Sequence, residues 1–224
     1  MSKKEIRSYQ FEIRSADNGS GTSTISGNPI VYNSPTDIGG WFQEVIERGA
    51  LDEADLTDVP LLVNHNAKMI PVARSRNNTP NSTLRLGVTV NGLEFDADLD
   101  TENNMTAREL NSAVVRKDIS GMSFGFRVAD ERWENLETDY PTRHILKFEK
   151  IAEISAVTFP AYEDTSIQSR AKETLESAKL ALDSAKRDEA APDGADKESL
   201  ESERKKLELE KEKFYFALKE GETK

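Results

Sequence analysis

The sequence predicts an α+β fold in which a strand-rich region precedes a charged helical tail. Segments with alternating apolar and polar residues fill most of the first 160 residues. One segment, 101–115, instead places apolar residues at helical spacing. After Tyr162 the composition changes to Ala, Glu, Lys and Leu, and no aromatic residue follows until Phe214. We therefore expect a compact domain over residues 1–168 and a separate tail over residues 169–224.

Composition excludes several classes of protein. Of 224 residues, 36% are hydrophobic and 32% charged, so a single compact core over the whole length is not expected. The net charge of -11 argues against a general nucleic-acid-binding surface. The absence of cysteine excludes disulfides, a thiol nucleophile and a Cys-ligated metal, and two histidines argue against a His-rich metal site. We expect no cofactor and no metal.

The sequence also gives an expectation for the compartment. No apolar run approaches the roughly 18 residues that a membrane-spanning helix needs. The first residues, MSKKEIRSYQFEIRS, carry charges where a signal peptide has its apolar segment. These patterns favour a soluble protein of a reducing or cytoplasmic compartment, without a membrane partner.

The first half of the chain reads mainly as strands. Alternation predicts strands over 6–14 and 24–32, with a loop at 17–22 between them. Residues 42–51 fit either a short helix or a strand followed by a turn, and the sequence does not decide between these. Strands at 84–90 and 93–99 flank Asn91-Gly92, a strong two-residue hairpin signal.

The next elements lead to the end of the compact domain. A helix is expected over 101–115, with Thr101 as its N-cap. A polar loop at 133–140 precedes strands at 143–150 and 150–159, and Pro160 closes the last strand because it cannot donate a ladder hydrogen bond.

Three short segments carry residues suited to chemistry. In VPLLVNHN, 59–66, the alternation places His65 at the end of a strand on the face of Leu61 and Val63. In DISGMSFGFRV, 118–128, Ser123 lies opposite an aromatic stripe with Gly on either side, which leaves room for a substrate carbonyl. In KIAEISAVTF, 150–159, Glu153 stands among apolar neighbours and needs a partner.

Each segment also has a structural explanation. A lone histidine at a strand end is often a satisfied structural residue. Gly and Ser are ordinary residues of a turn that opens a half-buried strand. A carboxylate such as Glu153 is commonly paired with a neighbouring lysine or arginine. These alternatives stay open on the residues alone.

Taken in order, VNHN, ISGMSFGF and AEISAVTFPAY resemble the tailed-phage prohead (procapsid maturation) protease family, distant relatives of the herpesvirus assemblins. The resemblance covers about residues 6–168, with lesser marks at 27–33, at 42–51 and at Gly92-Leu93. It implies a serine endopeptidase built on a β-barrel flanked by helices. One departure lies at 71–74, PVAR, where many relatives carry a glycine before the arginine.

The resemblance also implies roles for the three residues. His65 takes the place of the general base, Ser123 that of the nucleophile and Glu153 that of the third triad member. Assemblins use a second histidine in the third role, so His144 is the alternative to Glu153. The chemistry is consistent, because a serine hydroxyl needs an adjacent base, and the base needs a third group that fixes its tautomer.

The family implies further expectations about substrates and location. The enzyme would cleave capsid and scaffold proteins, including itself, inside the assembling procapsid in the host cytoplasm, with the major capsid protein and its scaffold segment as partners. The tail reads as helices over 165–189 and 196–219, with a seven-residue repeat of Leu200, Leu207 and Phe214 that could pair in a homo-oligomer. A non-catalytic scaffold or assembly factor is the alternative function. A sugar- or nucleic-acid-binding barrel has little support from charge or aromatic content.

Overall fold

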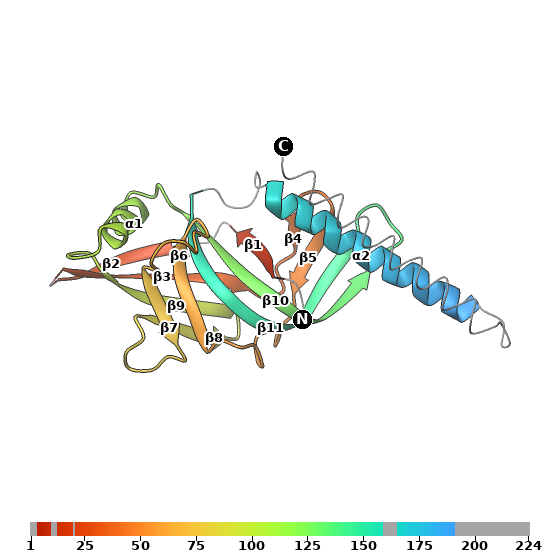
Figure 1. Ribbon diagram of the computed structural model, residues 1–224, viewed down its shortest axis with the longest axis horizontal. Coiled ribbons are helices and arrows are strands. Elements are labelled where there is room, and N and C mark those ends of the chain that lie inside the picture. Colours follow the sequence, from red (N-terminus) through yellow and green to blue (C-terminus); the bar gives the residue numbers. More distant parts are fainter. Residues whose placement is uncertain (1–3, 10–12, 20, 159–164, 191–224) are drawn as a thin grey trace. The chain divides into compact units, whose positions relative to one another are not determined.

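The computed structural model describes residues 4–9, 13–19, 21–158 and 165–190. The chain divides into two compact units, Met1–Lys179 and Leu180–Lys224. Strands dominate the first unit (Figure 1). The helices are α1 (Met105–Val115) and α2 (Thr165–Ala190), and the strands are β1 (Glu5–Tyr9), β2 (Ile13–Gly19), β3 (Thr22–Val31), β4 (Thr36–Ile38), β5 (Phe42–Ile46), β6 (Asp58–Val63), β7 (Ala73–Arg76), β8 (Leu84–Thr89), β9 (Gly92–Asp100), β10 (Gly121–Glu134) and β11 (Thr142–Val157).

The strands form two sheets. The larger sheet has the order β1-β10-β11-β5-β4, and β6 also pairs with β11 and carries β7 on its other side. The smaller sheet has the order β2-β3-β9-β8. The antiparallel strands β10 and β11 are the longest, with 14 and 16 residues. Strands β5 and β6 both run parallel to β11, β5 beside its beginning and β6 beside its end.

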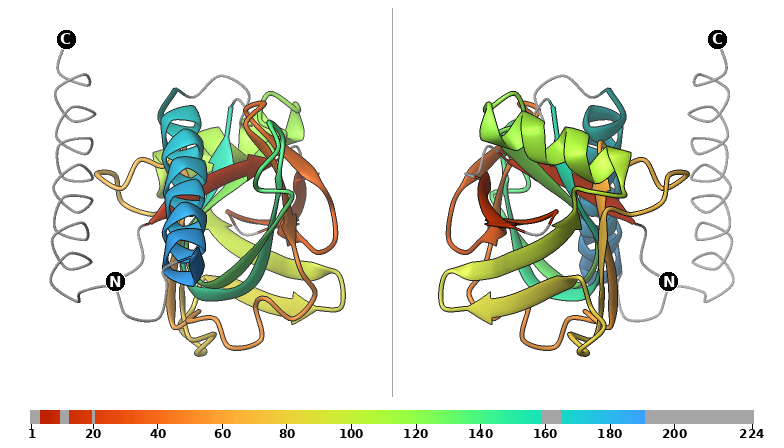
Figure 2. Two further views of the ribbon diagram at one scale, coloured as in Figure 1. Left: turned by 90° about the vertical axis from the view of Figure 1, so that its right-hand side faces the viewer. Right: turned by 90° about the vertical axis from the view of Figure 1, so that its left-hand side faces the viewer.

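One core lies between the two sheets. It contains Ile25 and Phe95 from the smaller sheet together with Phe124 and Phe148 from the larger one. Figure 2 shows α1 across one end of the sheets, where its apolar face joins the same core. The predicted α+β class is confirmed, but the expected barrel is not closed, since no strand pair among the described residues joins the two sheets.

Residues 42–46 form a strand rather than a helix. In β5, Phe42, Glu44 and Ile46 are buried and alternate with half-buried residues. The hairpin predicted around Asn91-Gly92 joins β8 and β9, but its two turn residues are Val90 and Asn91, because Gly92 already pairs with Thr89 as the first residue of β9. Gly92 has φ 144, and a Cβ there would lie 2.0 Å from the Ile30 carbonyl oxygen. Only glycine fits this position.

Two predicted boundaries are wrong. Helix α1 begins at Met105, and its N-cap is Asn104, whose side chain accepts a hydrogen bond from the Ala107 amide at 3.1 Å. Thr101 instead donates its hydroxyl to the Gly21 carbonyl at 2.9 Å, which ties the end of β9 to the start of β3. The two strands expected at 143–159 are one continuous strand, β11, and Pro160 lies outside the described residues.

A buried network of charged side chains lies on the core side of β1. Arg7 and Arg143 are each 1% exposed. Arg7 Nε donates to Glu44 Oε1 at 2.7 Å, and Arg143 Nη1 donates to Glu5 Oε2 at 2.7 Å. Arg143 also donates to Glu131. The network therefore ties β1 to β5, β10 and β11.

This network also determines the register of β1. Glu5 and Arg7 face inward, opposite Phe126 and Phe124 of β10. A slip of one residue would turn both charges to the other face of the sheet. Glu44 and Arg143 would then stay buried without their partners on β1, and an unpaired buried charge costs several kcal/mol of stability. The sequence gives no sign of this arrangement, because alternation usually places apolar residues inward.

The first part of α2 packs on the first unit. Ala171 and Leu175 are buried, and Lys172 Nζ lies 5.3 Å from the centre of the Trp41 ring. The helix predicted over 165–189 is observed, whereas the second predicted helix and its seven-residue repeat lie outside the described residues. The proposed boundary at residue 168 stays a prediction. Neither helix in the described part of the chain could span a membrane.

The charged network predicts a specific loss of stability in acid. Burial alone would raise the pKa of Glu5, but the charges of Arg143 and Arg7 outweigh it and lower that pKa to about 2. Because the pKa is lower in the folded protein than in the unfolded chain, the stabilisation is present above about pH 4.5 and is lost as the pH falls toward 2.

We therefore expect Glu5→Gln to be less stable than wild type at pH 7. The difference in the free energy of unfolding between the two proteins should narrow by about 3 kcal/mol as the pH falls through this range. Urea unfolding of both proteins from pH 7 to pH 2.5 measures this difference. Comparing the two proteins removes the contribution of the other carboxylates. A difference that is constant with pH would contradict the role of Glu5.

Candidate active site

The three segments singled out by sequence lie on neighbouring strands. Ser123 is on β10, directly opposite Ser155 of β11, and Gly125 is opposite Glu153. The end of β6 runs parallel to the same part of β11. Because directly opposed residues share a face of the sheet, Ser123 and Glu153 lie on one face. His65 follows β6 and reaches this face from the other side of β11.

His65 lies in a turn, not on a strand. Strand β6 ends at Val63, and Asn64 and His65 have φ values of 49 and 57. Asn and His tolerate this left-handed conformation better than most residues. The Asn64 amide donates to the Ala156 carbonyl at 2.9 Å, which holds the turn against β11. The predicted placement of His65 on the face of Leu61 and Val63 is therefore wrong.

His65 and Glu153 form a hydrogen bond. The distance from His65 Nδ1 to Glu153 Oε1 is 2.7 Å, and the Glu153 side chain is 3% exposed. A carboxylate only accepts, so Nδ1 carries the hydrogen and Nε2 of a neutral ring is left as an acceptor. Nε2 is shielded from solvent and has no hydrogen-bond partner among the described residues. Lys4 Nζ lies farther from Glu153 Oε1, at 3.8 Å.

The Ser123 hydroxyl is bonded to β1. It donates to the Arg7 carbonyl oxygen at 2.7 Å and accepts from the Ser8 hydroxyl at 2.7 Å. Ser123 is fully buried. The structure thus brings His65 and Glu153 into contact and places Ser123 on the same face, with its hydroxyl directed toward β1 in place of His65.

Gly125 provides the space that Glu153 occupies. A Cβ at this position would lie 2.8 Å from Glu153 Oε1 and 2.5 Å from Lys4 Cε. Its φ is not positive, so the requirement is for volume and not for an unusual backbone conformation. The glycine beside Ser123 was expected to make room for a substrate; the room it makes here is for the carboxylate.

The alternative residues have other surroundings. His144 Nδ1 lies 2.7 Å from Glu47 Oε1, and Nε2 lies 3.4 Å from Glu134 Oε2. It is opposite Arg132, far along β11 from Ser155. Ser120 is exposed and precedes the first residue of β10. Among the described side chains, neither His144 nor Ser120 contacts His65 or Glu153.

Sequence reasoning missed two groups in the site. Ser155 donates its hydroxyl to Glu153 Oε2 at 2.7 Å and is fully buried. Its position two residues after Glu153 on the same strand face is a signal that could have identified it. The contact of Ser8 and the Arg7 carbonyl with Ser123 has no sequence signal, because it depends on which strand pairs with β10.

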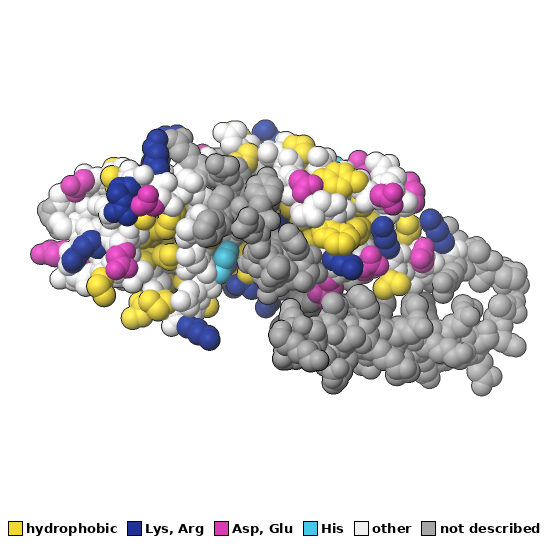
Figure 3. All heavy atoms as spheres, turned by 90° about the horizontal axis from the view of Figure 1, so that it is seen from above, with side chains coloured by type: hydrophobic (Ala, Val, Ile, Leu, Met, Phe, Trp, Pro, Cys, Tyr) yellow, Lys and Arg dark blue, Asp and Glu magenta, His cyan; other side chains and the backbone are white. Residues whose placement is uncertain are grey.

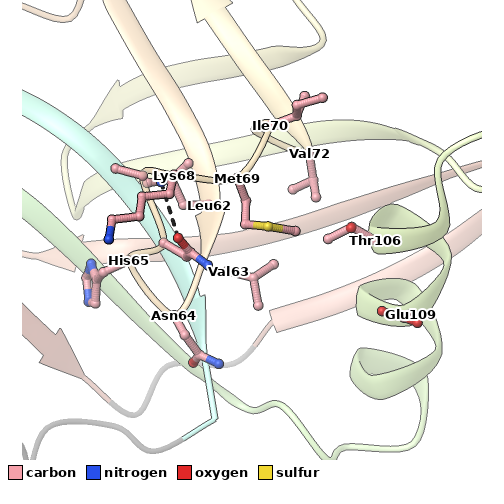
Figure 4. Close-up of a pocket in the computed structure, with 12 residues that line it drawn as sticks. Leu62, Val63, Asn64, His65, Lys68, Met69, Ile70, Val72, Thr106 and Glu109 are labelled. Atoms are coloured by element: carbon pink, nitrogen blue, oxygen red, sulfur yellow. Dashed lines mark hydrogen bonds between the residues drawn. The ribbon is translucent and has the colours of Figure 1, made fainter.

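A pocket of about 790 Å³ adjoins the turn that carries His65. It is lined by the loop over 62–70, by Val72 and by Thr106 and Glu109 of α1. Figure 4 shows the His65 ring at the edge of this pocket, turned away from Met69 and Val72. The pocket is therefore next to the site, but the imidazole does not point into it.

Charged side chains do not gather into a basic field on the surface seen in Figure 3. Where side chains are described there, lysines and arginines alternate with aspartates and glutamates, and apolar side chains form small areas between them. The described side chains on this face therefore form no continuous basic strip of the kind that a nucleic-acid backbone would need.

No curated protein matches this chain. A solved structure of the bacteriophage T4 capsid assembly protease, gp21, is similar, with 13% sequence identity and a TM-score of 0.44 over 70% of this chain and 98% of that chain. A family model described as caudovirus prohead serine protease matches residues 9–179, well over half of the sequence. The chain therefore belongs to the caudovirus prohead serine protease family.

Proposed function

We propose that Ser123, His65 and Glu153 form the catalytic triad with which this prohead serine protease cleaves peptide bonds during procapsid maturation. The observation that carries the proposal is the 2.7 Å contact between His65 Nδ1 and Glu153 Oε1. Glu153 is on β11, which pairs with the Ser123 strand β10 on one side and with β6, the strand before the His65 turn, on the other. A buried carboxylate next to an imidazole is the arrangement that fixes a general base in one tautomer.

The geometry supports a definite order of proton transfers. Glu153 holds the hydrogen on His65 Nδ1, so Nε2 can accept the Ser123 proton as the hydroxyl oxygen bonds to the substrate carbonyl carbon. His65 then returns this proton to the leaving amine as the peptide C–N bond breaks. Water, deprotonated in the same way, releases the acyl group from Ser123. Glu153 stays ionised and stabilises the imidazolium that forms in each step.

This reaction requires the Ser123 hydroxyl to turn from the Arg7 carbonyl toward His65. A serine hydroxyl reorients by rotation about one side-chain bond, and catalytic contacts often shorten only when substrate is bound. The Nε2 atom of His65 has no competing partner among the described side chains. After this rotation the Ser123 hydroxyl would donate to His65 Nε2 in place of the Arg7 carbonyl oxygen. The imidazole would then have a hydrogen-bond partner at both of its nitrogen atoms.

As a member of the prohead protease family, the protein acts in the procapsid on proteins of capsid assembly. We extend this to the major capsid protein with its scaffold segment, and to the protease itself, as substrates. We also propose that the tail beyond Lys179 recruits the enzyme to these partners or joins copies of it. Support comes from its composition, which is rich in Glu, Lys and Leu at helical spacing.

Substitution of the nucleophile tests the proposal directly. Ser123→Ala should lower peptide cleavage by at least about 10³-fold and preserve folding, whereas exposed Ser120→Ala should cleave normally. His65→Ala should lose as much activity, and the double variant no more, because the residues act as a unit. The mass of the expressed chain over time reports self-cleavage. Full activity in Ser123→Ala would contradict the triad, whereas a folded wild-type protein that cleaves neither peptide nor itself would favour a non-catalytic assembly factor.

The third triad member has a matched control elsewhere in the chain. Glu153 and Glu47 each bond the Nδ1 atom of a histidine at 2.7 Å, Glu153 with His65 and Glu47 with His144. Glu153→Gln should lower kcat by up to about 10⁴-fold, because an amide no longer holds the productive tautomer. Glu47→Gln should leave kcat unchanged. The reverse result, measured on the same peptide, would assign the third role to His144.

Two truncations test the separate role of the tail. A chain ending at Lys179 should fold and cleave peptides, since it keeps the buried residues Ala171 and Leu175. A chain ending at Arg170 loses both and should be less stable by about 2–3 kcal/mol. Thermal unfolding and peptide cleavage compare the two, and co-assembly with capsid protein should fail for both. If the chain that ends at Lys179 folds but does not cleave peptides, the tail supports the active site.

A further inference from the structure

We infer that Ser155 is a positioning residue of the active site: its hydroxyl holds both the Glu153 carboxylate and the His65 backbone in the arrangement that proton transfer requires. This inference rests on the proposed function, which gives Ser155 no role. Ser155 does not contact the substrate carbonyl in the proposed reaction, so its effect would be exerted through the other two residues.

Ser155 lies at the centre of the three segments that form the site. On one side of β11 it pairs with Ser123 of β10, and on the other side with Leu62 of β6. Its side chain therefore shares a face with Ser123 and with Glu153, two residues away on the same strand. Ser155 is fully buried. A buried hydroxyl here must find its partners inside the site.

The direction of each hydrogen bond follows from the chemistry of the partners. A carboxylate accepts and a backbone amide donates. The Ser155 proton therefore goes to Glu153 Oε2 at 2.7 Å, and the oxygen accepts from the His65 amide at 3.3 Å. With the 2.7 Å bond from His65 Nδ1 to Glu153 Oε1, these contacts close a ring of three hydrogen bonds.

The ring constrains both partners of the general base. Each Glu153 oxygen is bonded to a different group, so the carboxylate cannot rotate without breaking one bond. The His65 backbone has φ 57, a conformation that an unconstrained non-glycine residue rarely keeps. Within the described part of the chain, its amide donates to the Ser155 hydroxyl and to no other group. Lys4 Nζ lies 3.8 Å from Glu153 Oε1 and is a competing partner for the carboxylate. Without the Ser155 hydroxyl, the carboxylate is free to turn toward Lys4.

The test uses the full-length protein and a peptide that the wild type cleaves. Ser155→Ala should lower kcat by about 10- to 100-fold, the scale seen when a catalytic group is misplaced by about 1 Å. KM should stay within about twofold, because no substrate contact is removed. In proton NMR, the downfield resonance of the His65 Nδ1 hydrogen, identified by its absence in His65→Ala, should shift or broaden.

Ser75 supplies a matched control. It is 1% exposed, donates its hydroxyl to Asn78 Oδ1 at 3.2 Å and accepts from the Asn78 amide at 3.3 Å. Ser75→Ala thus removes a buried hydroxyl that, like Ser155, donates to a side-chain oxygen and accepts from a backbone amide; its acceptor is a neutral amide oxygen in place of a carboxylate, and it lies away from the site. It should lose comparable thermal stability while keeping the wild-type kcat and the wild-type His65 resonance.

The inference is overturned if Ser155→Ala retains both the kcat and the resonance of Ser75→Ala. Should Ser155→Ala fail to fold, Ser155→Cys keeps most of the volume with a weaker donor; a folded Cys variant with reduced kcat supports the inference, and one with full kcat overturns it. Failure of the proposed function is distinguishable, since cleavage by Ser123→Ala would refute the triad while leaving the His65 resonance and its response to Ser155→Ala unchanged.

Discussion

The pairing of β10 with β11 is the constraint on which the rest of the site depends. It places Ser123 opposite Ser155 and Gly125 opposite Glu153, so that the Ser123 hydroxyl and the Glu153 carboxylate share one face of the sheet. The parallel contact of β6 with the same stretch of β11 then brings His65 to that face. A shift of one residue in the β10–β11 register would turn Ser123 toward the core in place of Phe124. The aromatic side chains on the core side therefore fix the register that places Ser123 opposite Ser155, as well as the packing of the core.

The buried charged network makes a second contribution to the site. Arg7 and Glu5 anchor β1 from the core side through Glu44 and Arg143, and the outward side of the same strand offers the Ser8 hydroxyl and the Arg7 carbonyl to Ser123. Buried ion pairs add little net stability compared with apolar packing, but an unpaired buried charge is costly. The network thus selects one register of β1, and that register determines the immediate surroundings of Ser123.

Volume and backbone conformation set the remaining geometry. Glu153 fits beside β10 only because residue 125 has no side chain. His65 reaches Glu153 because the chain turns sharply after Val63, through two residues with positive φ. Both features explain why short motifs with glycine, asparagine and histidine carry the site. The residue types are selected for the space and the turn as much as for their reactive atoms.

The sequence by itself determined the strand-rich α+β class, a hairpin close to Asn91-Gly92, a helix that ends at residue 115 and three segments with reactive side chains, because these follow from local periodicity and turn chemistry. It did not determine that the sheets leave the barrel open, that Glu5 and Arg7 face the core, or that Ser155 joins Glu153 to His65. Those features arise from contacts between residues far apart in the chain. Such contacts depend on which strands pair and in which register, and only the tertiary structure decides that.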